Sequence, residues 1–349
     1  MSTKKQPKQL IPLIEGKSLL EIAVTRLSGL VEESRIFICA GEGMKGAVLG
    51  GVPGMTEKRF ISEPMGRDTL NAVALGTGVL GKLDPEAVVG IFTADHLIEP
   101  VDEFVKVVEQ GYQMGEQRAD LLVKFGVAPT HAATGYGYLE LGESVAEDAM
   151  AKRVVRFKEK PNEATAEQYF EAGAEKYLWN AGMFVWQAKT LMGCVEKFCP
   201  ENYAEISRVI ADWGTAKQQA TLNEVYPTLK KISVDYAVME PASVDDCYGV
   251  ASVPMPIDWL DVGSWPSLKK TLESDAVGNA AAGCKTMHLG SKNVMTVSDD
   301  PGHLITTIGC DDLIVIHTGK STLVCHKDQA EQIKQLHAEV GEAHGEEYL

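Results

Sequence analysis

Hydrophobic and polar positions in the first half of the chain follow two different periods. Apolar residues recur at helical spacing over 17–30, 69–83 and 101–115, and Ser18 with Glu21 has the spacing of a capping box. Between these segments lie short apolar runs of strand length, "RIFICA", "KRFIS", "AVVGIFT" and "ADLLVKFGV". Strands alternating with helices predict an α/β sheet with right-handed crossovers. The continuous apolar run "AVVGIFT" is typical of a parallel strand covered on both faces.

The second half of the chain has a different texture. From about residue 135 the strands are more irregular, with helices expected over 188–198 and 201–213. After Asp275, short strands are separated by Gly, Asp or Asn turns, and one helix is expected near 328–340. This pattern predicts an all-β appendage of stacked short strands. We therefore expect two domains, 1–274 and 275–349.

Composition and charge narrow the classes of partner. The 349 residues are 45% apolar and 23% charged, with a formal net charge of −16. Such a surface repels nucleic acid and anionic membranes, so neither is an expected partner. The seven cysteines include no CxxC pair, which favours reduced thiols. No apolar run approaches 18 residues and no signal-peptide core is seen, so we expect a cytoplasmic protein.

Two aspartates are candidates for binding a hard cation. Asp95 and His96 directly follow the apolar run "AVVGIFT", and ligands bind at the carboxyl ends of strands in open α/β sheets. Asp261 lies between two tryptophans, before a helix expected near Ser264. Position alone leaves metal binding and helix capping equally open for Asp95, and an ordinary turn is the simpler explanation of Asp261. Together they could bind Mg²⁺, which takes one or two carboxylates besides substrate phosphates and water.

Other polar or glycine positions at strand ends and turns are less specific, because each has an ordinary structural explanation as a solvated charge, a cap or a turn. Asp235, for example, suits the first turn of a helix capped by Ser233, which is a sufficient account without function. The remaining candidates of this kind are Arg67, Asp68, Gly135, Gly137, Glu159, Lys160 and Asn180.

The order of these segments is more specific than any one of them. In sequence, "PKQL", "GKSLLEIAVTRL", "SEPMGRDT", "TADHLI", "TGYGYLEL", "FKEKP", "WNAGMFVW", "SVDYAVME" and "WLDVGSW" resemble the mannose-1-phosphate guanylyltransferases. The resemblance covers nearly the whole chain and is close to the single-function bacterial form. It implies a Rossmann-like nucleotidyltransferase fold of the GT-A-like kind, with a mixed sheet and a small C-terminal domain resembling a β-helix.

The resemblance also implies an activity and roles for residues. GMP would pass from GTP to mannose-1-phosphate without a covalent intermediate, and Asp95 and Asp261 would hold Mg²⁺. Lys8 would face the nucleotide phosphates and Lys160 the sugar phosphate. A homodimer is left open. The residues implied near the base and ribose are Glu63, Arg67 and Asp68, and those implied near the sugar are Gly135, Tyr136, Glu159, Asn180 and Gly182.

Departures from the family pattern keep alternatives open. Asp68 stands where the family most often has Asn, so base choice is less certain. One alternative is a sugar nucleotidyltransferase that uses another base or hexose phosphate. A non-enzymatic alternative is a relative that keeps the fold and binds sugar nucleotides without turnover.

The start of the chain motivates one further expectation. Family members carry a first strand and a loop of pattern G-G-x-G-T-R-L-W-P-x-S before P-K-Q, which here is Pro7 to Gln9, with Ser2 aligned to the serine. The glycines of that loop form an anion nest for nucleotide phosphates. We expect a form without this segment to be poorly active and poorly stable, because phosphate donors and a central strand would be absent.

Overall fold

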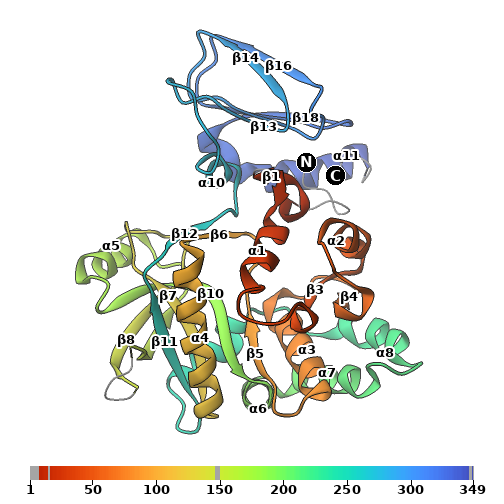
Figure 1. The fold of residues 1–349 in the computed structure, drawn as a ribbon, viewed down its shortest axis with the longest axis vertical. Helices are drawn as coiled ribbons and strands as arrows, with labels where there is room; N and C mark the ends of the chain where they lie inside the picture. The colour runs from red at the N-terminus through yellow and green to blue at the C-terminus, as the bar shows by residue number, and fades with distance from the viewer. Residues whose placement is uncertain (1–7, 15, 146–149, 346–347, 349) are drawn as a thin grey trace.

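The computed structural model describes residues 8–14, 16–145, 150–345 and 348, arranged as a large lower domain and a smaller C-terminal domain above it (Figure 1). The first residues described form a 3₁₀ turn, and Lys8 lies in it, although its side chain is outside the described part. The N-cap contact of the predicted capping box is present at Ser18, whose Oγ accepts from the Glu21 N–H at 3.1 Å. The elements that begin the chain are β1 (Pro12–Ile14), β2 (Lys17–Ser18) and α1 (Leu19–Leu27).

A six-stranded mixed sheet forms the centre of the large domain. Its strand order is β5-β10-β7-β11-β9-β8, in which β7 and β11 are parallel and the other neighbours antiparallel. The mixed sheet agrees with the predicted fold class. The bounds are β5 (Val88–Ile91), β7 (Leu121–Val127), β8 (Tyr138–Ser144), β9 (Lys152–Lys158), β10 (Tyr177–Gln187) and β11 (Gly249–Met255).

The prediction of a parallel strand at "AVVGIFT" is wrong in its direction. Among the described residues β5 pairs only with β10, and that pairing is antiparallel. Strand direction depends on which distant segment becomes the neighbour, and the local apolar run carries no such information. Two further strands, β3 (Ile38–Gly41) and β4 (Phe60–Glu63), form a separate parallel pair beside α2 (Lys45–Gly51).

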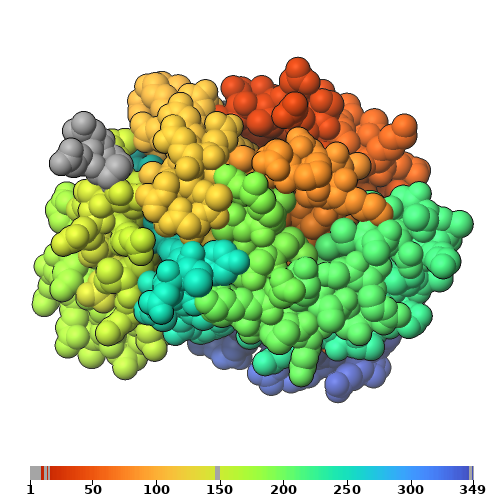
Figure 2. All heavy atoms as spheres, turned by 90° about the horizontal axis from the view of Figure 1, so that it is seen from below, coloured from red at the N-terminus to blue at the C-terminus, as the bar shows by residue number. Residues whose placement is uncertain are grey.

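Helices cover both faces of the sheet. On one face, α3, α6 and α7 contribute to the largest apolar core, which includes Leu70, Leu75, Leu191 and Ile206. On the other, α4 packs against the strands in a second core. In the view from below, α3, α4 and the green helices α6 to α8 occupy much of the surface (Figure 2). The bounds are α3 (Asp68–Leu83), α4 (Val101–Gln117), α5 (Glu163–Ala172), α6 (Ala188–Phe198), α7 (Pro200–Asp212) and α8 (Gln218–Val225).

The C-terminal domain is a stack of short strands, as predicted. Parallel pairs join β13 to β15, β15 to β17 and β14 to β16, and only β18 runs antiparallel to its neighbour β17 among the described strands of this domain. The domain ends in a 3₁₀ segment at Lys327–Gln332 and helix α11 (Ile333–His344). The strand bounds are β13 (Ala280–Ala282), β14 (Lys285–Leu289), β15 (Met295–Ser298), β16 (Leu304–Ile308), β17 (Leu313–His317) and β18 (Thr322–His326).

The two domains share an apolar core. Met295, Val297 and Ile314 from the stack cluster with Leu19 of α1 and with Leu268 of α10 (Trp265–Lys269). The cysteines are all free thiols. In the part of the chain that the structure describes, no helix combines the length and apolarity needed to cross a membrane.

Candidate active site

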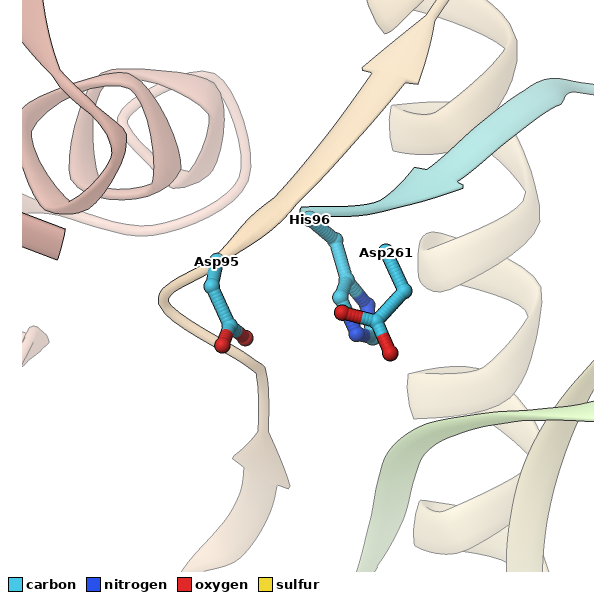
Figure 3. Close-up of side chains that lie close together, drawn as sticks. All are labelled: Asp95, His96 and Asp261. Carbon is cyan, nitrogen blue, oxygen red and sulfur yellow. The ribbon is translucent and has the colours of Figure 1, made fainter. Parts of the chain in front are cut away.

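Two aspartates and a histidine converge in the large domain (Figure 3). Asp95 lies in the turn after β5, His96 begins β6 (His96–Glu99) and Asp261 ends β12 (Asp258–Asp261). One side-chain ligand atom from each residue lies within 4.8 Å of the others. The antiparallel β6–β12 pairing places His96 directly opposite Asp261, so their side chains leave the same face.

Backbone and side-chain contacts fix the two carboxylates. The carbonyl oxygen of Asp95 accepts from the N–H of Val262 at 3.0 Å. Gln9 Nε2 donates to Asp95 Oδ2 at 3.4 Å. Gly263 gives the Asp261 carboxylate its space, because a Cβ there would lie 3.0 Å from Asp261 Oδ1. Both aspartates are half-buried, which leaves them accessible to an ion.

The carboxylates suit a hard cation better than the histidine does. Mg²⁺ prefers oxygen ligands and is usually bound through one or two carboxylates plus substrate phosphates. The buried His96 ring accepts a hydrogen bond from Trp259 Nε1 at Nδ1, with 3.1 Å between the nitrogens. Arg26 Nη1 also donates to the His96 carbonyl at 3.0 Å, which holds the backbone beneath the site. The donor set therefore fits Mg²⁺ held by Asp95 and Asp261.

A second polar cluster lies beside this pair and combines Glu159, Asn180, Asp235 and Lys124. Lys124 Nζ is 2.5 Å from Asp235 Oδ1, and Asn180 Nδ2 donates to the same oxygen at 3.2 Å. Burial raises the pKa of Glu159, and the charge of Asp235 raises it further, whereas Lys160 and Lys124 oppose this shift. We call these four residues the sugar-side cluster, because it contains the predicted sugar contacts Glu159 and Asn180.

Two glycines shape the sugar-side cluster and connect it to the carboxylate pair. A Cβ at Gly137 would lie 2.5 Å from Glu159 Oε2, and the Gly137 carbonyl accepts from the N–H of Asn180 at 2.8 Å. Gly182 has a φ of +65° and its N–H donates to Asn180 Oδ1 at 3.1 Å. A Cβ at Gly182 would lie 4.0 Å from His96 Cε1, so this irregular part of β10 lies between the two clusters.

A cleft of about 1150 Å³ opens between the domains, and five of the predicted or contacting residues line it: Gln9, Gly135, Tyr136, Lys160 and Asp261. The Tyr136 ring packs edge-on against Trp179 and Trp259, with centroids 5.1 and 5.0 Å away. The opposite wall comes from the turn 318–322 and from α11. Lys160 is largely exposed and 3.7 Å from the Glu159 carboxylate, so its ammonium is available to an anionic ligand.

The three predicted nucleotide residues do not line this cleft in the described structure. Glu63 is buried and accepts a hydrogen bond from the Tyr226 hydroxyl; burial raises its pKa. Arg67 donates to the Pro227 carbonyl, and Asp68 Oδ1 accepts from the Thr69 N–H at 2.8 Å. Asp68 is the first residue of α3 and this contact is a local one to its neighbour, so it does not cap the helix, whose N-cap Arg67 makes no side-chain cap bond. The nucleotide role of all three stays a prediction, and so does that of Lys8, whose side chain lies outside the described residues.

Sequence reasoning missed Lys124 and gave Asp235 only a structural role. The one available signal was a lone lysine inside the apolar run "ADLLVKFGV". An apolar run of this kind predicts burial, and a fully buried lysine needs a partner. Asp235 begins a π-helical turn (Asp235–Met239), which the sequence pattern did not predict.

Comparisons with known families cover both parts of the chain. Residues 2–276 match the nucleotidyl transferase family. Residues 285–339 match the MannoseP isomerase/GMP-like beta-helix domain. The two matches together span most of the described structure.

Individual relatives agree with these matches. A mannose-1-phosphate guanylyltransferase, RfbM, from Salmonella typhimurium is 31% identical over 96% of this chain and 68% of its own length. One from Klebsiella pneumoniae is 30% identical over 96% of this chain and 69% of its own. A crystal structure described as mannose-1-phosphate geranyltransferase, from Thermus thermophilus, superposes with a TM-score of 0.80 at 29% identity, covering 96% of this chain and 93% of that one.

Proposed function

Because the chain belongs to the mannose-1-phosphate guanylyltransferases of the nucleotidyl transferase family, we propose that it transfers GMP from GTP to mannose-1-phosphate. The products would be GDP-mannose and pyrophosphate. The single observation that carries this proposal is the convergence of Asp95 and Asp261 beside the sugar-side cluster. A site for a hard cation next to hydroxyl-binding groups is what a sugar-phosphate nucleotidyltransferase needs.

The proposed chemistry needs no side-chain nucleophile. A phosphate oxygen of mannose-1-phosphate forms a bond to the α-phosphorus of GTP, and the bond from that phosphorus to the pyrophosphate oxygen breaks. Catalysis is then positioning and neutralisation of charge. When bound at Asp95 and Asp261, Mg²⁺ would supply positive charge beside the phosphates.

The chain's own residues would bind and orient the sugar phosphate. Lys160 offers a cation in the cleft to the sugar phosphate, in a protein whose net charge is −16. Glu159 and Asn180 offer acceptors and a donor to the sugar hydroxyls. Tyr136, packed between two tryptophans, offers an aromatic wall at the cleft.

The second candidate is transfer of another nucleotide. It is favoured by Asp68, which stands where the family most often has Asn, in a segment that the resemblance places near the base. The test is a matrix of four nucleoside triphosphates against mannose-1-phosphate and glucose-1-phosphate, with chromatographic detection of the sugar nucleotide. GDP-mannose as the dominant product supports the proposal. Preference for another base would replace it with the second candidate.

A further inference from the structure

The side chain of Lys124 is fully buried in the main core of the large domain. It projects from the middle of β7, and its Nζ lies 4.5 Å from the centroid of the Phe157 ring and 4.9 Å from that of Phe184. Its ammonium is paired with Asp235 at 2.5 Å. Burial lowers the pKa of Lys124, while Asp235 raises it.

This ion pair is poorly explained by stability alone. Desolvating two charges costs more than their attraction commonly returns, so apolar residues of similar size often serve a core equally well. Aromatic faces around the ammonium offset only part of that cost. A buried lysine in the midst of phenylalanines therefore points to a use for the charge.

The partner carboxylate reaches the edge of the core. The Asp235 side chain is 18% exposed and that of Glu159 is 22% exposed, whereas Lys124 is 0% exposed. Asp235 begins a π-helical turn, a feature frequent at functional sites. Asn180 of β10 donates to Asp235, and its Oδ1 accepts from the N–H of Gly182, at the irregular part of the same strand beside His96. Glu159 lies beside Gly137, whose carbonyl accepts from the Asn180 N–H.

We propose that Asp235 binds a hydroxyl group of the sugar ring and that Lys124 is the positioning residue that holds it there. This inference rests on the proposed function. Asp235 and Glu159 would accept hydrogen bonds from neighbouring hydroxyls, with Asn180 between them. Lys124 contacts no sugar; its ammonium holds the Asp235 carboxylate in one orientation through the 2.5 Å contact.

The arrangement predicts discrimination between epimers. A hydroxyl of the wrong orientation would leave a partly buried carboxylate without its hydrogen bond, which binding sites of this kind reject strongly. Loss of a hydrogen bond to a charged group lowers the affinity for a ligand by about tenfold or more. Loss of this hydrogen bond should weaken binding of the sugar phosphate and leave binding of the nucleoside triphosphate unchanged.

The test is the double variant Lys124→Met/Asp235→Asn. Methionine has the length of lysine without its charge, and asparagine keeps the shape of aspartate, so no buried charge is left unpaired. We expect the thermal midpoint to stay at or above that of the wild type. We expect KM for mannose-1-phosphate to rise about tenfold or more, KM for GTP to change by less than about twofold, and the preference over glucose-1-phosphate to shrink.

A matched control is Lys197→Met/Asp245→Asn. This pair also has its charged atoms 2.5 Å apart and its ammonium beside two aromatic rings, Phe198 and Tyr248, but it lies outside the proposed site. The control should leave both KM values unchanged. An equal rise of the sugar KM in the control would overturn the inference, because the effect would then be general.

The outcomes separate the inference from the proposed function. Normal wild-type activity with an unchanged sugar KM in the Lys124/Asp235 variant overturns the inference alone. A parallel rise of both KM values in that variant also overturns it. A wild-type protein that turns over no sugar phosphate with any nucleoside triphosphate overturns the proposed function, and the inference with it.

Discussion

The indole Nε1 of Trp259 donates a hydrogen bond to Nδ1 of His96, at 3.1 Å, with the two rings nearly perpendicular at 85°. An indole nitrogen can only donate, so Nδ1 must be the acceptor. The neutral imidazole therefore carries its proton on Nε2. In this tautomer neither ring nitrogen of His96 offers a metal a lone pair, since Nδ1 accepts from Trp259, so the proposed metal ligands are Asp95 and Asp261.

Trp259→Phe tests this relationship, because it removes the donor and keeps an aromatic ring. Hydrogen-bond partners of metal ligands change metal affinity by about tenfold or more, and because His96 is a neighbour of the proposed ligands, a change of up to about tenfold is expected here. We expect the Mg²⁺ concentration for half-maximal activity to rise within that range, and Mn²⁺ binding measured by electron paramagnetic resonance to weaken in parallel. Trp213→Phe, after the last turn of α7, is the control and should alter neither quantity.

Asp95→Asn and Asp261→Asn test the proposed metal site. Each change removes a negative ligand with almost no change of shape, and loss of one preorganised charge interaction costs about a hundredfold or more in rate. We expect kcat to fall by that amount and Mn²⁺ binding to be lost, with little change in the thermal midpoint. Asp258→Asn, at the exposed start of the same strand, should behave as the wild type. Retention of ion binding in both site variants would contradict the assignment.

Gly182→Ala tests the irregular part of β10 between the two clusters. Its φ of +65° costs an alanine about 1–2 kcal/mol, although the space around it is adequate. We expect the free energy of unfolding to fall by that amount and KM for mannose-1-phosphate to rise, because relief of the strained φ would shift the Gly182 N–H that orients Asn180. Gly173→Ala at the end of α5, with φ +82° and nothing within 4 Å, should cost stability without changing KM.

Tyr226→Phe tests the buried contact to Glu63. Burial raises the pKa of Glu63, so the folded state holds this proton more tightly than the unfolded chain. Glu63 therefore contributes its full share to the free energy of unfolding below the pKa of an ordinary carboxyl. That contribution is lost as the pH rises through the pKa of Glu63 in the folded protein. The hydrogen bond from Tyr226 lowers the pKa of Glu63 and so opposes the effect of burial, because it stabilises the ionised carboxylate.

We expect Tyr226→Phe to reduce the free energy of unfolding by about 1–3 kcal/mol, more at pH 8 than at pH 5. The difference arises because hydrogen bonds to a charged carboxylate are the stronger ones. Denaturant titrations at both pH values measure it. Equal losses at the two pH values would mean that Glu63 has the same charge at both. Glu63→Gln should remove the pH-dependent part.

The sequence predicts most helices and strands of this protein, but not the short elements that build its site. The segments "HLIE" and "DWLD" are too short to show a period, and only their pairing brings Asp261 to His96. The proximity of Asp95 and Asp261 was expected from the family resemblance and is present; their spacing alone could not indicate it. The lone lysine in "ADLLVKFGV" indicated that Lys124 needs a buried partner, but no pattern in the sequence indicated that the partner is Asp235, 111 positions away.

The pairing of His96 with Asp261 makes the site depend on the register of β12 against β6. Side chains in a strand alternate between faces, so a one-residue slip of β12 against β6 would turn Asp261 away from His96. A slip of two residues would restore its face. It would still move the carboxylate about 7 Å along the strand, so the site depends on this one register, and changes of loop length should be tolerated only where the loop absorbs them and the β6–β12 pairing is unchanged.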